Sequence, residues 1–335
     1  MTSAAYLPDA PSDALGPFAA HRRLLFDVAY RMLGSVVDAE DVLQDAWLSW
    51  DRADRSAVLN PRAYLVRTVT NLSLNRLTSA RAARETYIGP WLPEPLLTET
   101  LPAGSLSAAS LPTVPDGAEQ VERAETVSTA MLVVLESLSP LERAVFVLRE
   151  VFGYSYAEVA GVLDRAEATV RQTGHRARAH VRARRPRFAT EPGQRREVTR
   201  RFLAACAGGD LNAVMELLAP GVTAWSDGGG KVTAARRPLH GADHVARWLL
   251  GMLAKPSLRA VTLESARVNG EESVVFVYGG VARAALTYDL DAVDGRVVNL
   301  RLQVNPEKVA GLAGLVGLGE PAGLVGRSVG GASGM

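Results

Sequence analysis

Two helix starts in close succession constrain the fold of this chain more than any other feature. Ser139 and Glu142 have the spacing of a capping box, in which each side chain binds a backbone N–H of the first helical turn. Ser155 and Glu158 repeat that pattern after Gly153, which is expected to end the first helix. The segment therefore predicts short helices joined by tight turns, as in a helix-turn-helix motif.

A further helix, expected to begin near Glu167, has one apolar side and one basic side. Small and apolar residues recur at helical spacing from Val170 to Val181 and are expected to face the core. In the major groove Gln can bond adenine and Arg can bond guanine, while further Arg side chains hold phosphate. A basic surface helix of an ordinary bundle is the alternative. The residues expected to face or flank DNA are Glu167, Ala168, Arg171, Gln172, His175, Arg176 and Arg178.

Charge is segregated along the chain, although the formal net charge is only +1. From Arg165 to Arg187 there are eight Arg and one Glu, whereas from Glu85 to Glu122 there is no Lys or Arg. The first segment suits phosphate and the second would be repelled by it.

The 335 residues are too many for one ordinary core and suit several domains. Strand-like runs near the C-terminus, with Asn269-Gly270 and Asp294-Gly295 as hairpin turns, indicate an α+β domain. The expected parts are a disordered arm at 1–17, an all-helical block at 18–84, an acidic Pro-rich linker at 85–117, a second helical block at 118–186, the α+β domain at 195–309 and a flexible tail at 310–335.

The first helical block carries an acidic stripe bordered by apolar area. A solvated acidic face explains the carboxylates but explains an outward-facing Leu48 less well. Asn60 and Pro61 then open a long helix whose polar groups suit unpaired bases or phosphate, although a polar helix surface is an equal alternative. The stripe and its border are Asp38, Asp41, Gln44, Asp45 and Leu48; the polar groups are Tyr64, Asn71, Ser73, Asn75, Arg76 and Arg81.

Several function classes are disfavoured by composition. Cys206 is the only cysteine, so no internal disulfide or cysteine-based metal cluster can form, and it is expected to lie in a helix core. No apolar run is long enough to span a membrane, and the N-terminus does not have the pattern of a signal peptide. A cytoplasmic protein that needs no metal or cofactor is expected.

Three segments together resemble extracytoplasmic-function (ECF) sigma factors of RNA polymerase. They are DAEDVLQDAWL at 38–48, PRAYLVRTVTNLSLNR at 61–76 and the segment at 139–178. The resemblance implies that the first binds the clamp of the polymerase β′ subunit, the second reads the opened minus-10 element and the last reads the minus-35 element. Tyr64 stands where that family commonly has Trp, and Asn75 where it commonly has Asp.

Three shorter motifs resemble the ECF subgroup that carries a fused SnoaL-like domain, a cone-shaped α+β fold like that of nuclear transport factor 2. For that subgroup the resemblance implies that the extra domain contacts the linker and both sigma blocks and modulates activity, so that no dedicated anti-sigma factor is required. The motifs are Trp91, Leu92, Pro93, Glu94 and Pro95 in the linker; Asp227, Gly228, Gly229, Gly230 and Lys231; and Asn305, Pro306, Glu307 and Lys308.

Other interpretations of the C-terminal domain stay open. The glycine run could be a phosphate loop, but it has no Walker spacing, so a turn with positive φ is expected. SnoaL-like folds include enzymes that use a pocket Asp or His as general base, and a small-ligand pocket is a further alternative. The candidate bases are His240, Asp243, His244, Asp289 and Asp291.

Two rival functions compete with a sigma factor that binds polymerase core and promoter DNA without a catalytic site. One is a ligand-responsive helix-turn-helix repressor or activator, which would have no use for the acidic stripe. The other is a cyclase or isomerase attached to a DNA-binding segment.

Overall fold

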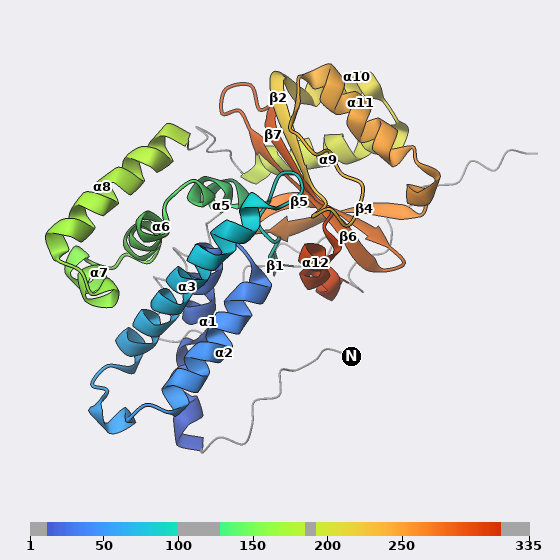
Figure 1. The fold of residues 1–335 in the computed structure, drawn as a ribbon. Coiled ribbons are helices and arrows are strands. Elements are labelled where there is room, and N and C mark those ends of the chain that lie inside the picture. Colours follow the sequence, from blue (N-terminus) through green and yellow to red (C-terminus); the bar gives the residue numbers. More distant parts are fainter. Residues whose placement is uncertain (1–11, 100–127, 185–191, 316–335) are drawn as a thin grey trace, which may run out of the picture.

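The computed structural model describes residues 12–99, 128–184 and 192–315 of the chain. A helical part and a part built on a curved sheet lie side by side and contact each other (Figure 1).

The first helical block is an antiparallel arrangement of three helices. Ser35 caps the second helix by accepting a hydrogen bond from the backbone N–H of Asp38, and Asn60 Oδ1 caps the third by accepting from Ala63 N. Contrary to the expected disordered arm at 1–17, the first helix already begins at Ser12, and Phe18 anchors its start with an edge-on contact to Trp47. The elements are α1 (Ser12–Leu33), α2 (Val36–Asp51), the 3-10 turn η1 (Arg55–Ala57) and α3 (Pro61–Glu85).

The second helical block confirms the helix-turn-helix prediction. Both expected capping boxes are formed. The helix that follows the second capping box, Tyr156–Leu163, ends at Asp164, which has a left-handed conformation with φ 52°. The elements are α5 (Thr129–Glu136), α6 (Pro140–Phe146), the π-helical turn η2 (Val147–Val151), α7 (Tyr156–Leu163) and α8 (Glu167–Arg184).

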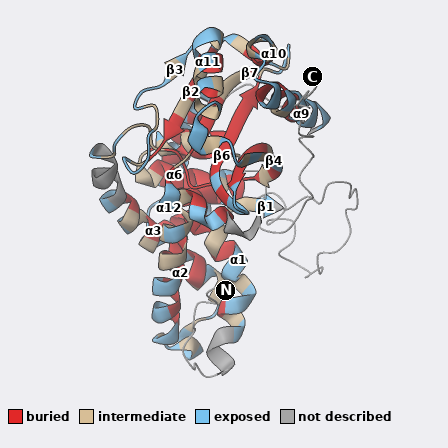
Figure 2. Ribbon diagram, turned by 90° about the vertical axis from the view of Figure 1, so that its right-hand side faces the viewer, coloured by how far each residue is buried: buried red, intermediate tan, exposed pale blue. Residues whose placement is uncertain are grey.

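The two helical blocks share one continuous apolar core, so they are packed against each other (Figure 2). Arg143 of α6 crosses the boundary: its guanidinium donates to the backbone oxygens of Met32 at the end of α1 and Leu135 in α5. Only 2% of Arg143 is exposed, and Glu136 neutralises its charge.

The C-terminal domain is a curved seven-stranded sheet with the order β1-β4-β5-β6-β7-β2-β3, in which only β2 and β7 run parallel. Its helices are α9 (Pro192–Gly208), α10 (Leu211–Leu217), α11 (Ala242–Leu253) and α12 (Pro306–Val309), with 3-10 turns η3 (Pro256–Leu258) and η4 (Ala310–Leu315). Its strands are β2 (Leu218–Asp227), β3 (Leu239–His240), β4 (Val261–Val268), β5 (Glu271–Tyr278), β6 (Val281–Leu290) and β7 (Val297–Gln303), joined by β1 (Leu97–Glu99) from the linker.

Each face of the sheet has its own apolar core. On one face α9, α10 and α11 form the larger core, which includes the buried Cys206 as expected. On the other face Val309 and Leu312 pack with apolar residues of β4, β5 and β6. The predicted α+β fold is therefore present, with most of its helices on one face of a single sheet.

Two expected irregular segments are packed against this sheet. Residues 97–99 of the expected linker form β1, an edge strand that pairs with β4, because Leu97 reaches the smaller apolar core. Leu312 of the expected flexible tail is fully buried in the same core. Sequence reasoning missed both because Leu97 follows a Pro-rich stretch and Leu312 stands among Gly and Ala, and each acquires its apolar partners only in the tertiary structure.

Candidate functional site

The basic helix α8 docks through one face and exposes the other. Val170, Gly174, Ala177 and Val181 are buried as expected. Gly174 packs tightly, because a Cβ there would lie 3.1 Å from the Tyr156 ring and would require that side chain to shift. The helix can therefore approach α7 closely, and its opposite face is presented to solvent.

The predicted DNA-facing residues of α8 lie on that open face. Ala168, Gln172 and His175 are exposed, as are Arg171 and Arg176. Glu167 and Arg178 are half-buried: Glu167 pairs with Arg171, and Arg178 pairs with Glu150 at 3.1 Å. The arrangement can present a polar reading edge with Arg groups around it.

Helix α2 likewise has two faces. Val42, Ala46 and Trp47 are buried, whereas Gln44 and Asp45 are exposed. Leu48 shares the exposed face, with 40% of its surface accessible. Leu48 therefore shares this exposed face with Gln44 and Asp45, and a single exposed apolar residue of this kind is common on protein surfaces.

One ion-pair group joins residues that the sequence had assigned to different surfaces. Arg76 of α3 donates to Asp38 Oδ1 at 2.8 Å and to Asp41 Oδ2 at 2.5 Å. Arg76 was predicted to contact minus-10 DNA and the two Asp residues to contact polymerase. In this arrangement the three side chains bind one another, each remaining partly exposed.

The remaining residues predicted to read the minus-10 element differ in accessibility. Asn71 and Asn75 are exposed on α3, and Tyr64 is half-buried beside Trp50, with ring centroids 5.6 Å apart. Ser73 is fully buried, because it falls on the face of α3 that packs into the helical core, so its predicted DNA contact is wrong in this arrangement. The side chain of Arg81 lies outside the described residues.

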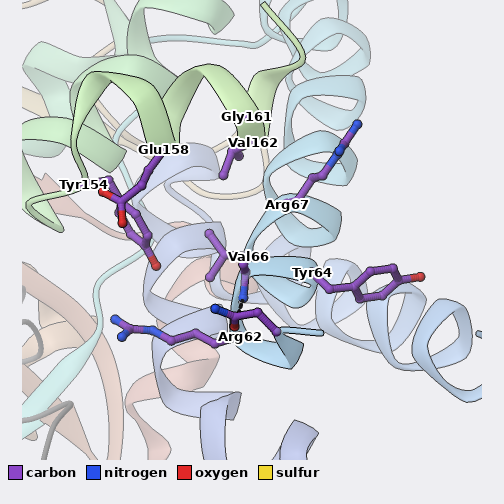
Figure 3. A pocket seen from close by; sticks show the side chains of 10 residues that line it. Arg62, Tyr64, Val66, Arg67, Tyr154, Glu158, Gly161 and Val162 are labelled. Carbon is purple, nitrogen blue, oxygen red and sulfur yellow. Dashed lines mark hydrogen bonds between the residues drawn. The ribbon is translucent and has the colours of Figure 1, made fainter. Parts of the chain in front are cut away.

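A groove of about 390 Å³ separates the start of α3 from α7. Figure 3 shows Arg62 and Tyr154 on one side of it and Tyr64 pointing away from α7. The groove exists only because the two helical blocks are packed together.

The three short motifs meet at one buried junction. The Asp227 carboxylate is completely buried and accepts hydrogen bonds from Tyr87 Oη at 2.6 Å, from Leu92 N at 2.8 Å and from Lys308 Nζ at 2.7 Å. Gln303 Nε2 donates to the same carboxylate at 3.2 Å. A carboxylate with this many donors and a paired cation can be buried without a large penalty.

Lys308 contacts the linker at Leu92 and Trp91. Its ammonium group donates to Leu92 O at 2.7 Å and lies 4.2 Å from the centre of the Trp91 ring. Asn305 caps α12 and donates to Tyr87 Oη at 3.0 Å, and Lys231 pairs with Glu307 at the exposed rim. Two of the short motifs, both in the C-terminal domain, thus contact the third, which lies in the linker.

The glycine run of this junction is a turn, as expected. Gly229 and Gly230 have φ of 57° and 72°, and no helix follows them. A Cβ on Gly229 would lie 2.3 Å from Asn305 Nδ2, so only Gly allows the turn to approach α12 this closely.

Two residues after Leu92, the linker also binds helix α2. The Glu94 carboxylate accepts from Val36 N at 2.7 Å, from Ser35 Oγ at 3.1 Å and from Val37 N at 3.4 Å. Burial raises the pKa of Glu94, while these hydrogen bonds oppose that change. Glu94 therefore binds the N-terminus of the helix that carries the exposed acidic stripe.

Sequence reasoning missed several residues that make these contacts. Tyr87, Gln303, Arg143 and Asn269 each bind partners more than 70 residues away or across a domain boundary. Single-sequence patterns carry no signal for such pairings.

The candidate general bases lie in local ion pairs, in turns or on the surface. The Asp289 carboxylate is held by Arg301 and Asn299, and Asp291 caps its own turn. Asp243 pairs with Arg247 on the exposed side of α11, where His244 is also exposed. Across residues 12–99, 128–184 and 192–315, no cluster of three or more His, Cys, Asp or Glu could hold a metal ion. Within the same ranges, no helix is long and apolar enough to cross a bilayer.

Comparison with known protein families agrees with this architecture. Residues 18–83 match Sigma-70 region 2, residues 128–181 match Sigma-70 region 4 and residues 199–301 match a SnoaL-like domain.

Two curated proteins of Mycobacterium tuberculosis are similar along most of their length. The ECF RNA polymerase sigma factor SigJ is 40% identical over 88% of this chain and 92% of its own, and the probable ECF RNA polymerase sigma factor SigI is 32% identical over 90% of this chain and 96% of its own. The crystal structure of SigJ superposes with a TM-score of 0.64 and 36% identity, covering 89% of this chain and 98% of that one. The chain therefore belongs to the ECF sigma factors of the sigma-70 family, which direct RNA polymerase to specific promoters for transcription initiation, and it carries a C-terminal SnoaL-like domain.

Proposed function

We propose that the C-terminal domain regulates this sigma factor by holding its two helical blocks together through the linker. The observation that carries the proposal is that one short stretch of the linker contacts both the C-terminal domain and the first helical block. Leu92 is bound by Asp227 and Lys308, and two residues later Glu94 binds the start of α2.

The packed arrangement conflicts with simultaneous promoter contacts. The minus-10 and minus-35 elements are separated by about 25 base pairs, on the order of 80 Å along B-form DNA. The two helical blocks share a single apolar core, so they must separate before both elements can be bound. Contacts that favour the packed form therefore oppose initiation, and a separate anti-sigma factor is not required in this scheme.

The individual surfaces are assigned as follows in the proposal. The exposed face of α2, with Asp45 and Leu48, binds the clamp of the β′ subunit; exposed Asn71 and Asn75 on α3 read the minus-10 element; and the open face of α8 reads the minus-35 element. No catalytic step belongs to this function.

A small ligand is a further part of the proposal. A pocket of about 370 Å³ lies between linker residues Ile88 and Gly89 and the loop at 226–236. A molecule bound there would contact the linker and the glycine turn together, where it could alter their attachment.

Run-off transcription with core polymerase tests the proposal. The full chain is compared with a chain that ends after Arg187, and with a full chain in which Asp41 and Asp45 are both changed to Lys. The truncated chain lacks the contacts that favour the packed form, so it should initiate more than the full chain, and the charge-reversed chain should not bind core enzyme. Equal or lower initiation by the truncated chain would remove the proposed regulatory role, and normal core binding by the charge-reversed chain would remove the assigned polymerase surface.

A further inference from the structure

The hairpin that joins β4 to β5 ends in a buried tip. Asn269 and Gly270 form its two-residue turn, with φ of 52° and 73°. Hairpin tips of this kind usually point into solvent, yet only 4% of Asn269 is exposed. Something must cover it, and the covering residues come from outside the C-terminal domain.

The Asn269 side chain binds three separate parts of the chain. Its Oδ1 accepts from Tyr30 Oη of α1 at 2.8 Å and from Leu96 N of the linker at 3.2 Å. Its Nδ2 donates to Thr129 Oγ1 at the start of α5 at 2.9 Å. One amide group is therefore bonded to the first helical block, to the linker and to the second helical block.

The backbone beside this amide is bound as well. Asn269 N donates to Leu96 O at 2.8 Å, and Gly270 N donates to Thr98 Oγ1 at 2.9 Å. Tyr30 Oη also lies 2.7 Å from Glu94 O, and burial raises the pKa of this Tyr, so it stays neutral as a donor. The linker thus fixes the tip, while the Asn side chain reaches both helical blocks.

The arrangement has an energetic consequence for opening. Separating the second block removes Thr129, the acceptor of Nδ2, and separating the first block removes Tyr30, one of the two donors to Oδ1. Each buried hydrogen bond lost in this way disfavours the open form. The three contacts are made together only while both blocks and the linker are in place.

We propose that Asn269 is a positioning residue that senses the joint presence of both helical blocks and latches the packed form. The latch is independent of the Asp227 junction, since it shares no hydrogen-bond partner with that carboxylate. Its effect on transcription rests on the proposed regulatory function, but its effect on the arrangement of the blocks does not.

The test uses the substitution Asn269→Gly in the full chain. Gly keeps the left-handed turn and removes only the side chain. Fluorophores on cysteines introduced at Arg52 and Ala179, in a Cys206→Ala background, report the separation of the two blocks by energy transfer. The fraction of open molecules should rise at least about fivefold, because the substitution removes the buried side-chain amide together with its hydrogen bonds to the two helical blocks.

A matched control and a second variant make the result decisive. Asp294→Gly alters the exposed β6–β7 turn in the same sheet and should leave the energy transfer unchanged. Thr129→Val removes the Nδ2 acceptor from the second block and should also open the chain, without additive effect in combination with Asn269→Gly. Unchanged energy transfer in both Asn269→Gly and Thr129→Val would overturn the latch.

Run-off transcription on the same variants separates the latch from the regulatory proposal. Opening together with altered initiation supports both. Opening with initiation equal to the parent chain supports the latch and overturns the regulatory role of the packed form.

Discussion

The open face of α8 and the junction around Asp227 use charged residues in opposite ways. On α8 most of the Arg side chains are exposed, and their ion pairs lie at the surface, such as Arg171 with Glu167 and the partly exposed Arg178 with Glu150. At the junction the Asp227 carboxylate is fully buried. Gly229 N is a local donor to it, and the four other donors come from positions 76 to 140 residues away. The first surface keeps its groups accessible to another molecule, whereas the second uses all of them to hold the chain together.

This difference predicts where substitutions will affect stability and where they will affect recognition. Removing one partner of a buried ion pair costs about 3–5 kcal/mol, whereas exposed pairs contribute about 0–1 kcal/mol. Substitutions at the junction should therefore change the conformation, and substitutions on α8 should change DNA binding alone.

The largest effect is expected for Asp227→Ala. It leaves the buried Lys308 ammonium without its carboxylate and removes the acceptor of Leu92 N. We expect a loss of about 3–5 kcal/mol in urea unfolding, together with faster hydrogen exchange of the Leu92 amide.

The exposed rim pair provides the control for that substitution. Glu307→Ala breaks only the ion pair with Lys231, and both side chains are largely accessible. Its cost should stay within about 1 kcal/mol. Equal costs for the two substitutions would show that the junction is no more than a surface contact.

The next largest effect is expected on α8. Gln172→Ala should reduce discrimination among minus-35 sequences by about 1–3 kcal/mol, because a bidentate base contact is lost. Urea unfolding should be unchanged, since the side chain is exposed. Fluorescence anisotropy with matched and mismatched promoter duplexes measures the discrimination, with Ala179→Ser on the same helix as control. An equal loss for every duplex would mean that Gln172 does not read a base.

A smaller effect is expected from pH within the C-terminal domain. Burial raises the pKa of Glu271 to about 7 from an ordinary value of 4.5, and Arg195 at 3.2 Å opposes this increase. Between those two values the folded state binds a proton that the unfolded state does not, so stability should fall as pH rises from 4.5 to 7. Urea midpoints across this range should show the decline, and Glu271→Gln should reduce it. An unchanged slope in the Gln variant would exclude Glu271 as its source.

The smallest effect on stability is expected for Arg76→Gln. The ion pairs of Arg76 with Asp38 and Asp41 are about one-third exposed, so their loss should cost less than about 1 kcal/mol. The substitution also frees both carboxylates, so affinity for core polymerase should rise or stay equal while promoter binding falls. Weaker core binding, measured by surface plasmon resonance, would contradict this arrangement.

The sequence predicted features that depend on neighbouring residues. Both capping boxes, the buried side of α8 and the Asn269-Gly270 turn follow from spacings of a few residues, and all are confirmed. Helical periodicity was less reliable on α3, where Ser73 looks polar but lies on the buried face. A polar residue in a helix carries no sign of whether it faces solvent or the core.

Tertiary contacts account for most of what the sequence could not predict. Leu97 and Leu312 become core residues only because the sheet provides an apolar face for them. The site residues of the polymerase and DNA surfaces remain predictions, whereas the contacts among the three short motifs follow directly from the hydrogen bonds around Asp227. Resemblance identified those motifs, but Tyr87 and Gln303, which complete the junction, stood outside them.

The central claim is that this chain is packed when free and open when it initiates transcription. Energy transfer between the same two labelled positions, measured for the free chain and then in a complex with core polymerase and promoter DNA, tests it most directly. High transfer in the free chain and a large decrease in an initiating complex are predicted. Equally high transfer in a complex that produces transcripts would contradict the account.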